Sequence, residues 1–237
     1  MKTRIWLIIL LYTVLILSAL LICSPLLLGL SLSLMPQDQI LAGHYFSTKM
    51  SLHNYVQAFQ STELVHYLVN SLLVSLLVMV GQLFLSSLAA YAFVFPKFRG
   101  QKVLFYFFIS TMMIPFEAQI IPDFQIIRDL NWLNTYPALI IPFIASAFGT
   151  FLLRQQYKQI PFELKEASDL IGMNHWKFYA KVVLPMSKVS LVTLGIYSFL
   201  TTWNMYLWPL LTSTNDTVRT LQIGLKQMQS QEPLNQW

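Results

Sequence analysis

Long uncharged segments are the feature that most restricts what this chain can fold into. No Asp, Glu, Lys or Arg occurs in residues 5–37, 64–96, 103–116, 130–153 or 189–215, which together make up more than half of the 237 residues. Charged residues are 11% of the whole chain, against about 25% in a soluble domain. The pattern excludes a water-soluble globular domain, a disordered chain and a nucleic-acid-binding protein. It makes the lipid bilayer the relevant solvent.

The apolar segments predict an all-α, polytopic bundle of transmembrane helices. A helix needs about 20 apolar residues to cross the hydrocarbon layer of a bilayer. Four segments meet this requirement alone, and the third meets it if Glu117 is tolerated within the crossing. The five expected crossings are 5–30, 68–95, 103–122, 137–153 and 189–211. A closed barrel is disfavoured because the segments are apolar on every side rather than alternating.

Two crossings carry further signals. The second is rich in Ser, Gly and Ala, which let helix backbones approach closely, so we expect it to pack inside the bundle. Pro115 and Pro122 are expected to break the third, because proline removes a backbone donor and kinks a helix. Residues 123–136 are then expected to hold a short helix lying in the membrane interface.

The distribution of positive charge predicts the orientation of the chain. If the N-terminus is cytoplasmic, eleven Lys and Arg residues fall inside and four outside, as the positive-inside rule requires. The inside residues are Lys2, Arg4, Lys97, Arg99, Lys102, Arg154, Lys158, Lys165, Lys177, Lys181 and Lys188, and the outside residues are Lys49, Arg128, Arg219 and Lys226. We therefore expect a multi-pass protein of the inner membrane of a prokaryote, with its N-terminus inside.

The first part of the chain is predicted to be a helix followed by a loop. Residues 1–34 are expected to form an uncleaved N-terminal transmembrane helix, because the segment lacks a small-x-small cleavage site. Cys23, the single cysteine, is expected to be a small buried residue. Residues 35–66 are predicted to form an external loop with a short interfacial helix beginning near Asn54. The loop histidines His44, His53 and His66 lack the short-range spacing of a zinc ligand pair, which favours solvated side chains.

The longest predicted cytoplasmic segment, 154–188, is too apolar for a plain linker. Pro161 suits the first position of a helix. The carboxylates of Glu163 and Glu166 lie near that N-terminus, where negative charge is favourable. The apolar residues of this helix share one face, and they are Leu164, Ala167, Leu170 and Ile171.

A tight turn and a second short helix are expected to follow. Gly172 can end the first helix in a left-handed conformation, and Asn174 can cap a helix over 175–183. Leu184 and Pro185 then end that helix before the fifth crossing. The loop presents an apolar face ringed by charge, and two interpretations fit it equally well. It is either a docking element for a partner protein or a helical hairpin that rests on lipid headgroups.

This loop resembles the EAA loop of ABC importer permeases. The family pattern is approximately Glu-Ala-Ala, a glycine four residues later, and Ile-x-Leu-Pro beyond. The residues that match it are Glu166, Ala167, Gly172, Leu184 and Pro185. Ser168 replaces the second alanine, and Ile171 replaces an aspartate that is often found before the glycine.

Other stretches resemble the sugar-type, MalG-like branch of the same permeases. These stretches are 88–93, 113–115, 151–155 and 203–210. Residues 115–117 and 206–209 look closest to the permeases of the branch that serves glycerol 3-phosphate. The resemblance extends from about residue 5 to residue 230.

The resemblance implies that residues 67–237 form a MetI-like permease core of a binding-protein-dependent importer for a carbohydrate or glycerol 3-phosphate. Such a permease pairs with a second permease subunit and rests on two ATP-binding subunits, while an extracytoplasmic solute-binding protein delivers the substrate. It implies no cofactor bound by this chain and no catalysis by it, because ATP is hydrolysed by the partner subunits. The family has six crossings, so we expect the sixth to be missing by C-terminal truncation.

The resemblance also implies functional residues. Those expected to dock on an ATP-binding subunit are Glu163, Leu164, Glu166, Ala167, Ser168, Leu170, Ile171, Gly172, Leu184 and Pro185. The candidates for the translocation path are Glu117, Asn204 and Tyr206, because polar residues within a membrane usually face a cavity or a partner. Structural pairing and, for Glu117, a place at the interface are alternatives. The aromatic residues near Asn204 are also typical of a membrane-interface belt.

Two other functions remain open from the sequence. A self-contained secondary carrier would show internal repeats with discontinuous helix pairs in matching halves, and the chain has no convincing repeat. A membrane scaffold without a transport role is the other alternative. An enzyme is disfavoured because the sequence has no phosphate-binding loop, nucleophile–base pair or metal-ligand spacing.

Overall fold

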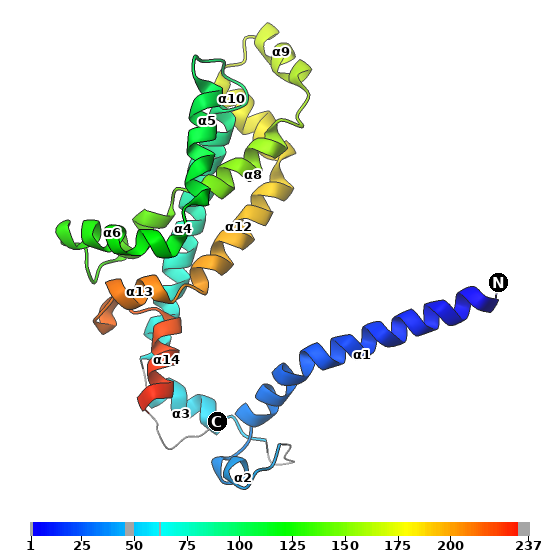
Figure 1. Cartoon of the computed structure of the whole chain (residues 1–237), viewed down its shortest axis with the longest axis vertical. Helices are drawn as coiled ribbons and strands as arrows, with labels where there is room; N and C mark the ends of the chain where they lie inside the picture. The colour runs from blue at the N-terminus through cyan, green and yellow to red at the C-terminus, as the bar shows by residue number, and fades with distance from the viewer. Residues whose placement is uncertain (1, 46–49, 62, 232–237) are drawn as a thin grey trace. The chain divides into compact units, whose positions relative to one another are not determined.

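The computed structural model describes residues 2–45, 50–61 and 63–231, and the regular structure within these residues is helical (Figure 1). The chain divides into two compact units, Met1–Glu63 and Leu64–Trp237.

The described residues of the first unit form three helices. Helix α1 (Lys2–Ser33) is a long apolar helix with Pro25 inside it, and α2 (Gln37–Leu41) and α3 (His53–Ser61) follow. The helix expected near Asn54 is therefore present. The Asn54 amide donates to the carbonyl oxygens of Ser33 and Met35, at 3.1 and 2.8 Å, which ties α3 to the end of α1. The expectation that Cys23 is buried is wrong, because its side chain is exposed on α1.

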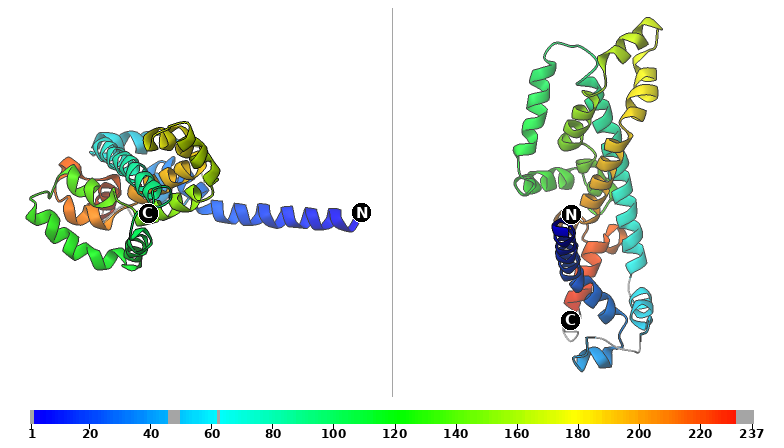
Figure 2. Two further views of the ribbon diagram at one scale, coloured as in Figure 1. Left: turned by 90° about the horizontal axis from the view of Figure 1, so that it is seen from above. Right: turned by 90° about the vertical axis from the view of Figure 1, so that its right-hand side faces the viewer.

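The second unit is built around α4 (Leu64–Ala92), against which α8 (Ala147–Tyr157) and α12 (Lys188–Trp203) pack (Figures 1 and 2). One side of the helix, which carries small and polar residues together with Val74 and Val78, is buried, while several of its leucines are exposed. Ser71, Ser75, Ser86 and Ser87 are buried, whereas the leucines beside them are largely exposed. This is the arrangement of a helix whose small side chains allow close packing while its apolar side chains face lipid. It confirms that the second crossing lies inside the bundle.

The remaining helices of this unit are short and sharply connected. They are α5 (Gln101–Ser110), α6 (Phe116–Asp129), α7 (Tyr136–Ile140), α9 (Phe162–Leu170), α10 (His175–Phe178), α11 (Leu184–Met186), α13 (Leu207–Thr212) and α14 (Leu221–Gln231). Between α10 and α11 the chain forms one π-helical turn, Tyr179–Val183. Two apolar clusters hold the unit together, one centred on Tyr157 and Phe178 and the other on Leu139 and Trp208.

The third crossing is not one helix over 103–122. Helix α5 continues as a short 3-10 turn to Met113, the chain extends at Ile114 and Pro115, and α6 leaves at 98° to the preceding helical segment. Pro115 causes the break because it has no N–H to donate. Pro122, by contrast, lies inside α6 without ending it. The helix expected over 123–136 therefore begins earlier, at Phe116.

The fourth and fifth crossings are also interrupted. The segment Tyr136–Phe143 meets Ala147–Tyr157 at 41°, and His175–Met186 meets Lys188–Trp203 at 78°. The predicted fifth crossing, 189–211, is divided between α12 and α13. By length and composition, the described residues contain two helices able to cross a membrane, Ile5–Ser33 and Leu64–Ala92, or up to five spans if each bent pair is one span.

Candidate functional site

The candidate site is the loop that contains α9 and α10. Helix α9 ends in a glycine turn, as predicted: Gly172 has a φ of +70°, and its N–H donates to the carbonyl oxygen of Asp169 at 3.0 Å. The N–H of Met173 donates to the carbonyl oxygen of Ser168 at 2.9 Å. These two bonds are the Schellman pattern that closes a helix C-terminus. Glycine is needed here because of the positive φ and not for lack of space, since a Cβ at residue 172 would meet nothing within 4 Å.

The start of the second short helix is also as predicted. The side-chain oxygen of Asn174 accepts a hydrogen bond from the N–H of Lys177 at 2.8 Å. This satisfies one of the free donors at a helix N-terminus. Pro161, expected at the first helical position of α9, lies one residue earlier as its N-cap, with a φ of −56° and an extended ψ of 131°.

Helix α9 turns its apolar side outward and its polar side inward. Leu170 and Ile171 are 89% and 74% exposed, and Leu164 is exposed too. Lys165 and Ser168 are buried against the rest of the unit. The Lys165 ammonium forms an ion pair with Asp169 and lies 5.6 Å from the centre of the Phe178 ring. The helix is therefore amphipathic, but its apolar face is exposed and its polar face is buried, which is the opposite of an ordinary surface helix.

The predicted docking residues fall into two groups. Glu163, Glu166, Ala167 and Pro185 are exposed together with the apolar residues just named. Ser168 does not belong with them. Its side chain is 4% exposed, and its hydroxyl donates to the carbonyl oxygen of Lys165 at 2.7 Å. Leu184 is half-buried and packs on the cluster around Tyr157.

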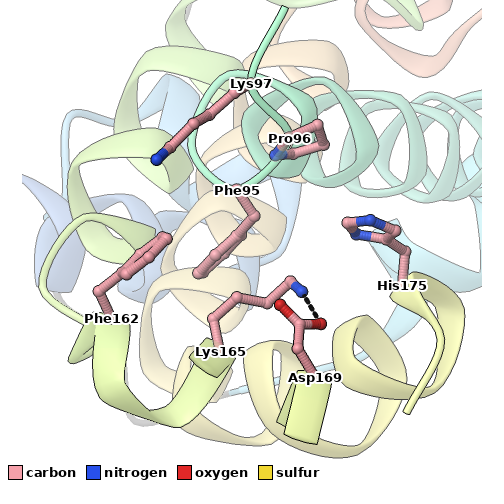
Figure 3. A pocket seen from close by; sticks show the side chains of 7 residues that line it. All are labelled: Phe95, Pro96, Lys97, Phe162, Lys165, Asp169 and His175. Atoms are coloured by element: carbon pink, nitrogen blue, oxygen red, sulfur yellow. Dashed lines mark hydrogen bonds and ion pairs between the residues drawn. The ribbon is translucent and has the colours of Figure 1, made fainter. Parts of the chain in front are cut away.

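A cleft of about 510 Å³ separates α9 and α10 from the turn that follows α4 (Figure 3). The residues that line it are Phe95, Pro96, Lys97, Phe162, Lys165, Asp169 and His175. The Lys97 ammonium lies 5.7 Å from the centre of the Phe162 ring, so the turn and α9 meet through a cation–π contact. The sequence pattern did not predict this pairing, because the two segments are about 65 residues apart.

The helix after the glycine turn is fixed to the transmembrane helices by polar contacts. The Ser87 hydroxyl oxygen lies 2.6 Å from those of both Tyr157 and Tyr179. The Tyr91 hydroxyl lies 2.9 Å from Nδ1 of His175. None of these five residues was predicted from the sequence to belong to the site. A tyrosine in an apolar segment signals a hydroxyl that needs a partner, but the partner is not identifiable without the fold.

The three candidate path residues lie at helix ends. Glu117 is exposed in the first turn of α6, and Tyr206 is partly exposed just before α13. The Asn204 amide donates to the carbonyl oxygen of Leu200 at 2.8 Å, which closes the end of α12. None of the hydrogen bonds found among the described residues joins any two of the three. The aromatic belt expected here does not include Trp208, which is 0% exposed and packs in the protein core.

Within the part of the chain that the structure describes, no three His, Cys, Asp or Glu side chains converge as metal ligands. His66 instead lies against the backbone, with Nε2 2.9 Å from the carbonyl oxygen of Thr217.

The arrangement of helices is that of an ABC-importer permease. It superposes on a chain of a bacterial ABC transporter involved in the import of the acidic polysaccharide alginate, with a TM-score of 0.88 and 24% identity, over 98% of this chain and 83% of that one. Residues 82–232 match the family described as binding-protein-dependent transport system inner membrane component. The chain belongs to this family.

Curated relatives carry the name sn-glycerol-3-phosphate transport system permease protein UgpE. The protein from Yersinia enterocolitica is 37% identical over 161 residues, which cover 68% of this chain and 57% of the relative. The protein from Brucella abortus is 33% identical over 197 residues, which cover 83% and 68%. The protein from Agrobacterium fabrum is 34% identical over the same length. The printed name describes these relatives as permease proteins of a transport system.

Proposed function

We propose that this chain is a transmembrane subunit of an ABC importer and that α9 docks on an ATP-binding subunit. The observation that carries the proposal is the reversed polarity of α9, in which Leu170 and Ile171 are exposed while Lys165 and Ser168 are buried. Apolar surface in water costs about 25 cal/mol per Å², and apolar patches rimmed by polar groups typically mark interaction sites. A partner that covers this face removes that cost.

The residues around the exposed face have complementary roles in the proposed contact. Glu166 accepts hydrogen bonds from the partner, and Ala167 keeps the helix surface shallow enough to enter a cleft. Gly172 allows α10 to fold back beside α9, so that the exposed Trp176 side chain extends the contact surface. Ser168 is left out of the contact, because its side chain is buried and its hydroxyl donates within α9 to the carbonyl oxygen of Lys165.

The remaining partners follow from membership of the family. A second permease subunit completes the translocation path, two ATP-binding subunits hydrolyse ATP, and an extracytoplasmic binding protein delivers the substrate. The chain itself performs no chemical step, and it lies in the inner membrane with its N-terminus and α9 on the cytoplasmic side. The excess of positive charge on that side supports this orientation.

For the substrate we propose sn-glycerol 3-phosphate, with a carbohydrate as the second candidate. The names of the curated relatives support the first candidate. The matched part of this chain covers 57% of the Yersinia relative and 68% of the Brucella relative. Asn204 and Tyr206 are assigned to the path. Glu117 is assigned a structural place beside the path, because a carboxylate repels a phosphate ester. Uptake of labelled glycerol 3-phosphate tests the assignment, and import of sugars alone would contradict it.

Co-purification tests the docking claim. In the variant Glu166→Gln with Gly172→Ala, the amount of ATP-binding subunit that co-purifies is expected to fall at least tenfold. The variant removes a charged acceptor and strains the glycine turn. A loss of about 1.4 kcal/mol in binding free energy is enough for a tenfold fall. The matched control is Glu117→Gln with Gly100→Ala. Gly100 has a φ of +82°, also with open space around it, so the control carries the same backbone strain elsewhere.

The control is expected to retain the ATP-binding subunit at the level of the unmodified chain. Undiminished co-purification of the Glu166 and Gly172 variant would contradict docking. It would favour the alternative in which the hairpin rests on lipid headgroups.

A further inference from the structure

Three hydroxyl groups meet at one buried point between the loop and the transmembrane helices. The Ser87 oxygen lies 2.6 Å from the Tyr157 oxygen and 2.6 Å from the Tyr179 oxygen. The exposed fractions of these residues are 1%, 0% and 9%. A serine hydroxyl offers one donor and two acceptor sites, so it can serve both phenols at once. Three segments, α4, α8 and the π-helical turn after α10, are therefore joined within an apolar cluster.

A second contact lies one turn away on both helices. The Tyr91 hydroxyl is 2.9 Å from Nδ1 of His175 and 3.3 Å from its carbonyl oxygen. Tyr91 follows Ser87 by four residues on α4, and Tyr179 follows His175 by four residues, so the contacts pair in antiparallel order. The Tyr91 and Tyr179 rings also meet edge to face, with centres 5.3 Å apart.

Two directional contacts one turn apart fix the register of this helix pair. Apolar side chains such as Phe95 and Phe178, which also pack here, tolerate small sliding movements because their contacts have no direction. A buried hydroxyl that loses its partner is unfavourable, so these contacts resist sliding. The π-helical turn Tyr179–Val183 begins at the tyrosine of the first contact, and such turns are frequent at functional sites.

We propose that the Ser87–Tyr179 and Tyr91–His175 contacts form the link through which movement of the docked loop reaches α4. Ser87 and Tyr179 are positioning residues in this account, because they touch neither substrate nor ATP. The inference rests on the proposed function, since the link matters only if α9 is seated on an ATP-binding subunit. A pull on α9 is passed through the glycine turn to α10, and the two contacts pass it on to α4.

The test measures coupling in the assembled transporter. The chain is reconstituted in proteoliposomes with its ATP-binding subunits, the second permease subunit and the solute-binding protein. The quantity measured is the ratio of glycerol 3-phosphate imported to ATP hydrolysed. Tyr179→Phe and Ser87→Ala are each expected to lower this ratio about fivefold, while co-purification of the ATP-binding subunit is unchanged. The double variant is expected to be no worse than either single variant, because both remove the same contact.

Tyr157→Phe is the matched control. It removes one phenol oxygen from the same serine but leaves the contact between the loop and α4 intact, so its ratio is expected to match that of the unmodified chain. An equal fall in Tyr157→Phe, or no fall in Tyr179→Phe and Ser87→Ala, would overturn the proposal. If the unmodified chain fails to retain the ATP-binding subunit, the proposed function itself has failed.

Discussion

At the scale of one residue, Trp208 is an aromatic side chain that is buried in the protein core. Its indole N–H donates to the carbonyl oxygen of Ala138 at 2.9 Å, and its ring meets that of Phe143 edge to face at 5.8 Å. Because the donor is satisfied inside the protein, the residue does not need the water of the membrane interface. It therefore joins α13 to α7 instead of belonging to an aromatic belt.

Replacement of this side chain tests its role in the core. Trp208→Phe is expected to lower the free energy of unfolding by about 3 kcal/mol, because it removes the indole donor to the Ala138 carbonyl and opens a cavity. Denaturant unfolding in detergent measures the change. Trp203→Phe is the control, since Trp203 is partly exposed and stacks on Phe199. Equal losses of unfolding free energy in the two variants would contradict the assignment of Trp208 to the core.

Residue-level prediction from sequence succeeded where the cause is local. Gly172 and Asn174 were identifiable because a left-handed turn and a helix cap need particular residue types within a few positions. Ser168 could not be placed, since periodicity shows which residues share a face but not which face the rest of the chain covers. Lys165 is buried only because Asp169 and the Phe178 ring compensate its charge.

At the scale of the helices, the close approach of α8 and of the segment just before it to α4 depends on two glycines, Gly81 and Gly149. A Cβ at Gly81 on α4 would lie 2.6 Å from Cγ2 of Ile144, between α7 and α8. A Cβ at Gly149 on α8 would lie 2.6 Å from the Ser86 hydroxyl oxygen. Both contacts are shorter than van der Waals separation, so α4 and α8 can pack as they do only without these side-chain atoms.

An alanine scan of the glycines tests this packing. Gly81→Ala is expected to lower the free energy of unfolding by about 1–3 kcal/mol, which is the usual effect of overpacking. Gly195→Ala on α12 is the control, because its Cβ would meet Leu83 at 3.5 Å, an ordinary contact. Thermal unfolding of the purified variants compares the two. The packing account would be wrong if Gly195→Ala proved the more destabilising.

The helices themselves were predictable, but their bends were only partly so. Apolar length predicted α1 and α4 within a few residues, and Pro115 predicted a break. The 98° angle at that break was not predictable, because it depends on the packing of Phe116 and Ile127 in the cluster around Trp208. The division of the last predicted crossing at Asn204 was missed, since its flanking residues are as apolar as the rest.

At the scale of the whole molecule, the orientation in the membrane rests on the distribution of charge. The turn after α4 carries Lys97, Arg99 and Lys102, and α6 carries Arg128 near its end. The two regions are expected on opposite sides of the membrane. Both Arg99 and Arg128 are exposed, so each position is open to a labelling reagent.

Cysteine labelling in intact cells checks the orientation. In a Cys23→Ser background, Arg128→Cys is expected to react with a membrane-impermeant maleimide, and Arg99→Cys only after the cells are permeabilised. The reason is that the positive-inside rule places the residue-99 turn in the cytoplasm. The reverse pattern would invert the proposed topology and put α9 on the wrong side for an ATP-binding subunit.

Site-specific photo-crosslinking determines whether α9 is seated on an ATP-binding subunit. A photoreactive amino acid at Ile171, which is 74% exposed on the loop, is compared with one at Val189, which is 73% exposed at the start of α12. We predict an adduct with the ATP-binding subunit from residue 171 and none from residue 189. An assembled complex that gives no adduct from residue 171 would contradict the claim.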